Sequence, residues 1–150
     1  MSPALPDHRV VARGLLALLC IIQGLVTMAI DLSHTHATNP LWPRHARFHL
    51  VWQVISTVCF CALEVALLCW RGPYTEQRFY LAVVLTGIPL LGFLGALIGR
   101  SIYGGALSDP NGIPPAKVDI FGNVHHFDLN VVAVGAAWVA IAAIWSIYSL

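Results

Sequence analysis

The amino-acid sequence predicts an all-α fold, an integral membrane four-helix bundle with two polar loops on one side. Hydrophobic residues make up 58% of the 150 residues, charged residues only 10%, and the mean hydropathy is +0.76. A soluble domain carries roughly 25% charged residues, so this chain has too little polar surface to cover a water-exposed globule. Its four apolar stretches are near the length of about 20 residues that a bilayer-spanning helix needs.

The predicted spans form a single domain over residues 1–150 and cover residues 14–30, 45–70, 79–103 and 129–150. The first span follows Arg9 and Arg13, a start that is also typical of a secretory signal peptide. No small-residue cleavage site follows it, so we expect a retained first span. Pro43 lies just before the second span, where proline suits the start of a helix.

The third span carries Gly92, Gly95 and Gly99, a spacing of small residues that allows helices to approach closely. We expect this face to pack against another helix, either within the chain or in a homo-oligomer. Cysteines 20, 59, 61 and 69 all lie inside the spans, where they are interpreted as small core residues.

Four spans place both polar loops on one membrane face and both termini on the other. The loops are residues 31–49 and 109–128, and they contain six of the seven histidines. Three prolines are expected to keep the second loop irregular. The small excess of arginine on the terminal side favours cytoplasmic termini and outward-facing histidine loops. The net charge of +1 and the lack of a basic stripe exclude nucleic acid as a partner.

The histidines suggest a metal site at the loop face. His45 and His49 are four residues apart at the start of a helix, which puts both imidazoles on one face. If the last helix begins near Asn123, His125 and Asp128 also share a face. These ligand types suit a transition metal, Zn or Fe ahead of Cu or Mn. The candidate ligands are His34, His36, His45, His49, His125, His126 and Asp128. The alternative is that the histidines are ordinary interfacial residues.

Two polar stripes run from the loops into the predicted spans. In the second span the stripe covers about a third of the helix circumference and contains His45, His49, Gln53, Ser56 and Glu64. In the first span a similar stripe contains Gln23, Thr27 and Asp31. Both stripes are expected to face the bundle interior, because charged groups facing lipid cost several kcal/mol. The loops would then form the mouth of a polar cleft.

Within this cleft, three carboxyl groups are candidate catalytic residues that would move protons: Asp31, Glu64 and Asp119. The structural alternative for Glu64 is a hydrogen bond to Gln23 or to a neighbouring helix. The candidate substrate-binding residues are Gln23, Arg44, Arg47, Trp52 and Gln53. The two arginines suit a phosphate or carboxylate group. Contact with lipid headgroups is the alternative for them.

The segments NPLWPRHARFH, residues 39–49, and HHFD, residues 125–128, resemble those of small uncharacterised bacterial four-span membrane proteins. The resemblance covers the whole chain and implies a bacterial inner membrane protein, but it implies no mechanism. The four-span layout is also similar to the emopamil-binding, or sterol-isomerase, class. That likeness implies acid–base groups in an intramembrane pocket.

The leading hypothesis is a membrane metal-dependent enzyme that acts on a hydrophobic or amphipathic small molecule at the His/Asp site. The substrate would reach the site laterally from the bilayer. The first alternative is a metal-free acid–base isomerase or cyclase of a lipid-like substrate. The second is a non-enzymatic partner of a membrane complex, or a metal-handling protein.

Overall fold

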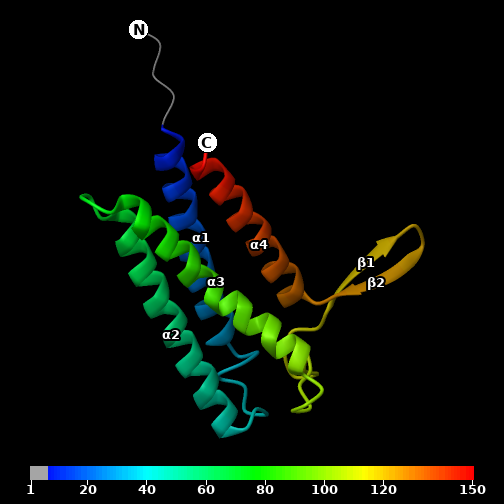
Figure 1. Cartoon of the computed structure of the whole chain (residues 1–150). Helices are drawn as coiled ribbons and strands as arrows, with labels where there is room; N and C mark the ends of the chain where they lie inside the picture. Colours follow the sequence, from blue (N-terminus) through cyan, green and yellow to red (C-terminus); the bar gives the residue numbers. More distant parts are fainter. Residues whose placement is uncertain (1–6) are drawn as a thin grey trace.

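The computed structural model describes residues 7–150 as four long helices and one β-hairpin (Figure 1). The elements are α1 (His8–Asp31), α2 (Arg44–Cys69), α3 (Thr75–Gly99), β1 (Ala116–Ile120), β2 (Asn123–Phe127) and α4 (Leu129–Tyr148). All four helices are long and apolar enough to cross a membrane. The predicted four-span membrane bundle is therefore confirmed.

Local capping explains where the helices begin. The Asp7 carboxylate accepts a hydrogen bond of 2.9 Å from the backbone N–H of Arg9, so α1 starts ahead of the predicted span. Pro43 immediately precedes α2, as expected from its fixed backbone angle. At α4, the Asp128 carboxylate accepts from the backbone N–H groups of Asn130 and Val131 at 2.9 and 3.2 Å.

The second polar loop differs from its prediction, because part of it is an antiparallel hairpin of β1 and β2. The turn residues Phe121 and Gly122 both have left-handed φ angles, 53° and 82°, which is the backbone of the tightest hairpin turns. The prolines end before β1, and alternating β-branched residues then favour a strand. The last helix begins at Leu129, as the predicted span 129–150 has it. The condition of a helix start near Asn123 is not met, and His125 and Asp128 do not share a helical face.

Both polar loops lie at one end of the bundle, and the start of α1, the end of α4 and the α2–α3 turn lie at the other end (Figure 1). This arrangement was predicted. The Asn39 side chain, only 6% exposed, joins the loops by donating a 2.7 Å hydrogen bond from Nδ2 to the backbone carbonyl of Asn111. The loop face is thus held together by an amide contact between segments 72 residues apart.

Packing is concentrated in the half of the bundle nearest the termini. The buried core there consists of Ala12, Leu16, Cys20, Leu68, Phe79, Ala82, Ile141, Ile144 and Tyr148. The rings of Phe79 and Tyr148 stack with centroids 3.7 Å apart and planes 6° apart. Within the described residues, α1 beyond Gly24 and α3 beyond Leu90 contribute no fully buried side chain. On α2, Val54 is the buried residue nearest the loops. The loop-side half is therefore packed less densely than the terminal half.

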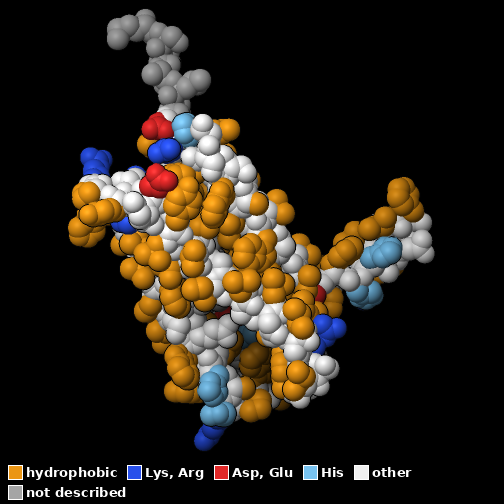
Figure 2. Space-filling model, in the orientation of Figure 1, with side chains coloured by type: hydrophobic (Ala, Val, Ile, Leu, Met, Phe, Trp, Pro, Cys, Tyr) orange, Lys and Arg blue, Asp and Glu red, His pale blue; other side chains and the backbone are white. Residues whose placement is uncertain are grey.

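The helices separate where this packing stops. From their connecting turn, α2 and α3 diverge toward the loop side (Figure 1). The space-filling view in Figure 2 shows a hollow between their loop-side ends. The bundle is therefore closed on the terminal side and open on the loop side.

Close helix approach depends on glycines other than the expected ones. A Cβ at Gly24 would lie 3.0 Å from Cβ and Sγ of Cys61, so this position brings α1 against α2. A Cβ at Gly87 would lie 3.4 Å from the Trp138 ring. In contrast, a Cβ at Gly92 or Gly95 meets no atom of residues 7–150 within 4 Å. The predicted glycine face of the third span is therefore not used for packing between the described helices.

Substituting alanine at Gly24 tests this contact. Alanine favours a helix over glycine by about 1 kcal/mol, but overpacking a tight contact costs about 1–3 kcal/mol. We expect Gly24→Ala to lower the unfolding temperature of the detergent-solubilised protein, measured by circular dichroism. Gly14→Ala is the matched control, because its Cβ would meet nothing within 4 Å. Equal unfolding temperatures for the two variants would contradict the close α1–α2 approach.

Candidate functional site

The polar stripe of α1 faces the bundle interior, as predicted. At about 100° per residue, Gln23, Thr27 and Asp31 lie on the same side of the helix as the buried residues Cys20 and Gly24. All three polar side chains are half-buried. The Gln23 Oε1 atom is buried and has no hydrogen-bond partner in the described part of the chain.

The stripe predicted for α2 is buried only at Glu64, and this is a correction. His45, His49 and Gln53 are exposed, whereas Val54 and Glu64 are buried. Gln53 and Glu64 lie within about 20° of each other around the helix, so their different burial comes from their position along α2: Glu64 lies in the packed terminal half and Gln53 nearer the loops. Polar groups at the end of a span sit near the headgroups, where they cost little, so nothing forces the histidines inward.

Glu64 forms a buried polar cluster with residues from two other helices. Its side chain is 4% exposed and lies next to the Cys20 thiol of α1 and the Thr86 hydroxyl of α3, each 1% exposed. The Thr86 Oγ1 donates to the Ala82 carbonyl at 2.8 Å. Its lone pairs are then free to accept from the Cys20 Sγ–H, 3.3 Å away. Cys61 also lies near Glu64.

No cationic side chain neutralises Glu64. The ion pairs found within residues 7–150 are His8–Asp7 and Arg9–Glu76, both at the terminal face. A carboxyl group at membrane depth without a cationic partner is unlike a structural salt bridge, and such groups commonly mark proton-transfer or binding sites. Along α1, Leu16 lies about one turn from Cys20 toward the packed terminal side. Gln23 lies about one turn from Cys20 toward the open loop side.

The candidate metal ligands lie at three separate places. His45 and His49 form an exposed pair on α2, with their Nε2 atoms 3.0 Å apart. In the first loop His34 is exposed, and the His36 Nδ1 lies 2.8 Å from the Thr35 hydroxyl. Within residues 7–150, no group of three or more histidine, cysteine or acidic side chains is placed to hold a metal ion.

The remaining ligand candidates lie on or beside the hairpin. His125 and His126 are neighbours on β2, so their side chains point to opposite faces of the ribbon. Asp128 caps α4. The histidines therefore do not converge with those of the first loop and α2.

The other predicted site residues lie mainly at the surface. The Asp119 carboxylate accepts a 2.8 Å hydrogen bond from the Gly122 backbone N–H and so stabilises the hairpin turn. Trp52 is exposed and stacks on His49, with ring centroids 5.8 Å apart. At the start of α2, Arg44 is exposed and Arg47 is half-buried. Their roles in substrate binding stay predictions.

Sequence reasoning missed Cys20 and Thr86 as neighbours of Glu64. The only signal in the sequence is that Thr86 is an isolated polar residue in a long apolar run. Cys20 is one of several membrane cysteines, and nothing in the sequence distinguishes it from Cys59 or Cys69. Cys20 and Thr86 become neighbours of Glu64 only because α1, α2 and α3 pack together.

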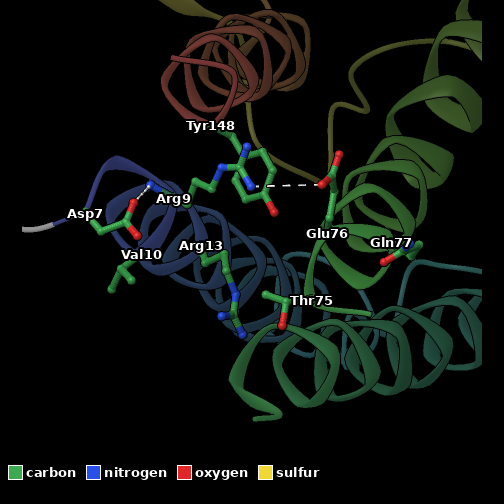
Figure 3. A pocket seen from close by; sticks show the side chains of 8 residues that line it. All are labelled: Asp7, Arg9, Val10, Arg13, Thr75, Glu76, Gln77 and Tyr148. Atoms are coloured by element: carbon green, nitrogen blue, oxygen red, sulfur yellow. Dashed lines mark hydrogen bonds and ion pairs between the residues drawn. The ribbon is translucent and has the colours of Figure 1, made fainter. Parts of the chain in front are cut away.

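A second recess, of about 320 Å³, lies at the terminal face (Figure 3). Arg9 pairs with Glu76 at 4.0 Å and lies 5.4 Å from the centroid of the Tyr148 ring. Arg13 donates to the backbone carbonyls of Leu68 and Trp70 at the end of α2. These contacts join the terminal ends of the four helices. The two arginines, counted in the sequence as topology signals, therefore also close this end of the bundle.

Comparison of the chain with protein-family models, with curated proteins and with solved structures gives no match.

The open half of the bundle is expected to admit water along the inner face of α1. A cysteine at Thr27, half-buried on that face, should react with a charged, membrane-impermeant thiol reagent in reconstituted protein. Val26→Cys is the matched control, because Val26 is 49% exposed on the lipid-facing side. Leu16→Cys, in the packed half, should not react either. Mass spectrometry of individual peptides separates these sites from the native cysteines, and equal labelling of residues 26 and 27 would contradict an open polar face.

Proposed function

We propose that this protein is a membrane-embedded acid–base enzyme, of the isomerase or cyclase type, that acts on a hydrophobic or amphipathic small molecule. Glu64 is the proton-transfer residue. The observation that carries the proposal is the burial of this carboxyl next to Cys20 and Thr86, at the closed end of a polar helix face. It favours the metal-free alternative over a metal site drawn from the loop histidines.

The apolar bundle surface and the buried Gln23 side chain together suggest a class of substrate. Most of the bundle surface is apolar, which suits a hydrocarbon body arriving laterally from the bilayer. The unpartnered Gln23 Oε1 suits a hydroxyl or amine that can donate a hydrogen bond, since a buried acceptor without a partner costs about 1–3 kcal/mol. The expected substrate is therefore largely apolar, with one polar group that donates a hydrogen bond.

In the proposed reaction the enzyme gives one proton to the substrate and takes one back. The Glu64 carboxyl donates a proton to one atom of the substrate, and the resulting carboxylate removes a proton from another atom. The product is an isomer of the substrate, and the enzyme returns to its starting state. The Thr86 oxygen would accept a hydrogen bond from the protonated Glu64 carboxyl and so orient it before the transfer. Positioned proton transfer of this kind contributes about 10²–10⁴-fold to rate.

Replacement of Glu64 by glutamine tests this function. Membranes from cells that express the wild-type protein, Glu64→Gln or Glu76→Gln would be compared by mass spectrometry of their lipid extracts. We expect a hydrophobic compound that the wild-type and Glu76→Gln proteins convert, and that Glu64→Gln converts at least about 100-fold more slowly. Glu76 is the matched control, an exposed carboxyl at the terminal face. Conversion at the wild-type rate by Glu64→Gln would sink the acid–base role.

A metal-dependent enzyme is the second candidate, and the His45–His49 pair favours it. Two imidazole nitrogens 3.0 Å apart can both reach one ion, because zinc binds nitrogen at about 2.0–2.1 Å. The pair lies at the start of α2, near the membrane surface. Zinc or iron is proposed ahead of copper or manganese, with water or substrate completing the coordination.

Metal analysis separates the two candidates. If the histidine pair is a metal site, purified protein should contain about one transition-metal ion per chain. The His45→Ala/His49→Ala double variant should lose it, whereas His8→Ala, at the terminal face, should keep it. Inductively coupled plasma mass spectrometry gives the metal content. The same content in all three proteins would contradict a site at His45 and His49.

In this proposal the chain lies in a bacterial inner membrane, with cytoplasmic termini and outward-facing loops. The terminal-side excess of arginine supports this orientation. The exposed glycines Gly92 and Gly95 leave α3 with a surface that suits a homo-oligomer.

A further inference from the structure

The β-hairpin is a separate amphipathic element that the proposed enzyme function does not use. Residues that pair directly across the two strands share a face of the ribbon. One face carries the pairs Ala116–Phe127, Val118–His125 and Ile120–Asn123. The other carries Lys117–His126 and Asp119–Val124. The first face is mainly apolar and the second mainly polar.

The apolar side of the hairpin is uncovered. The side chains of Val118, Ile120 and Phe127 are 43%, 39% and 40% exposed. Phe121, at the tip, is 100% exposed, and it holds a left-handed backbone conformation that is uncommon for an aromatic residue. An isolated two-stranded hairpin is marginally stable in water. Its apolar face and tip therefore need a covering surface.

The chain connections place the hairpin at the membrane surface. Phe127 ends β2 only two residues before Leu129, the first residue of a membrane-spanning helix. The hairpin extends sideways from the bundle and does not continue the direction of the helices away from the membrane (Figure 1). The surface beside it is therefore the headgroup and acyl-chain boundary of the bilayer on the loop side.

We propose that the hairpin of residues 116–127 is an interfacial membrane anchor. Phe121, Val118 and Ile120 contact the acyl chains, while Lys117 and His126 face water and the headgroups. Aromatic and aliphatic side chains on one face, with polar and charged side chains on the opposite face, are the composition of other elements that lie in a bilayer interface. The hairpin thereby fixes the orientation of the second loop relative to the membrane plane.

Lipid photo-crosslinking tests the anchor. The full chain would be reconstituted in nanodiscs of phosphatidylethanolamine and phosphatidylglycerol that contain a phosphatidylcholine with a diazirine near the end of one acyl chain. After irradiation, mass spectrometry locates the lipid adducts. We expect adducts on residues 116–127 of the wild-type protein, and about a five-fold loss of them in Phe121→Asp. Adducts on the helices serve as the internal standard.

Two further variants control for folding of the hairpin. Phe121→Leu keeps an apolar tip and should keep the adducts. His126→Asp introduces a carboxylate on the polar face, opposite Lys117, and should have little effect. Wild-type protein without adducts on the hairpin would overturn the proposal. The same result is expected if a second copy of the chain covers the hairpin, because residues 116–127 would then be shielded from the lipid-borne diazirine.

Discussion

The fold depends on close packing in the terminal half of the bundle. In a bilayer, apolar helices gain nothing from leaving water, so their association relies on van der Waals contact and hydrogen bonds between them. Here these contacts converge at one end. The stacked rings of Phe79 and Tyr148 join α3 to α4, and Arg13 satisfies carbonyl groups at the end of α2 that the helix itself leaves free. The close α1–α2 approach at Gly24 completes this packing. The other half can then be open, because the bundle does not depend on it.

Much of the fold could be predicted from the sequence, because hydropathy and the helical period are strong signals. The four spans, the side of both loops and the inward face of α1 follow from them. The inward face of α2 could not be predicted in the same way. A polar stripe at the end of a span has a second favourable environment in the headgroup region, and only packing decides between the two. The hairpin was missed because the prolines before it dominated the interpretation, although Phe121–Gly122 is a two-residue turn between β-branched segments.

In the candidate site too, some residues could be predicted from the sequence and others could not. Glu64 was predicted from its chemistry alone, since a carboxyl within a span needs a reason to be there. Its neighbours Cys20 and Thr86 could not be predicted, because a single small residue on each of two helices leaves no periodic pattern. Gathering histidines into one metal site failed as a spatial prediction for a related reason. Nearness to the same membrane face does not bring side chains within a few ångströms, and the two loops meet through Asn39 and Asn111.

A bundle clamped at one end and open at the other has a mechanical consequence. The helices are rigid rods, so a small change in angle at the clamped end becomes a larger displacement at the loop side. The hydrogen bond between Asn39 and Asn111 limits how far the loops can separate. The width of the open half is therefore set by the helix angles at the packed end and by this single contact at the loop end.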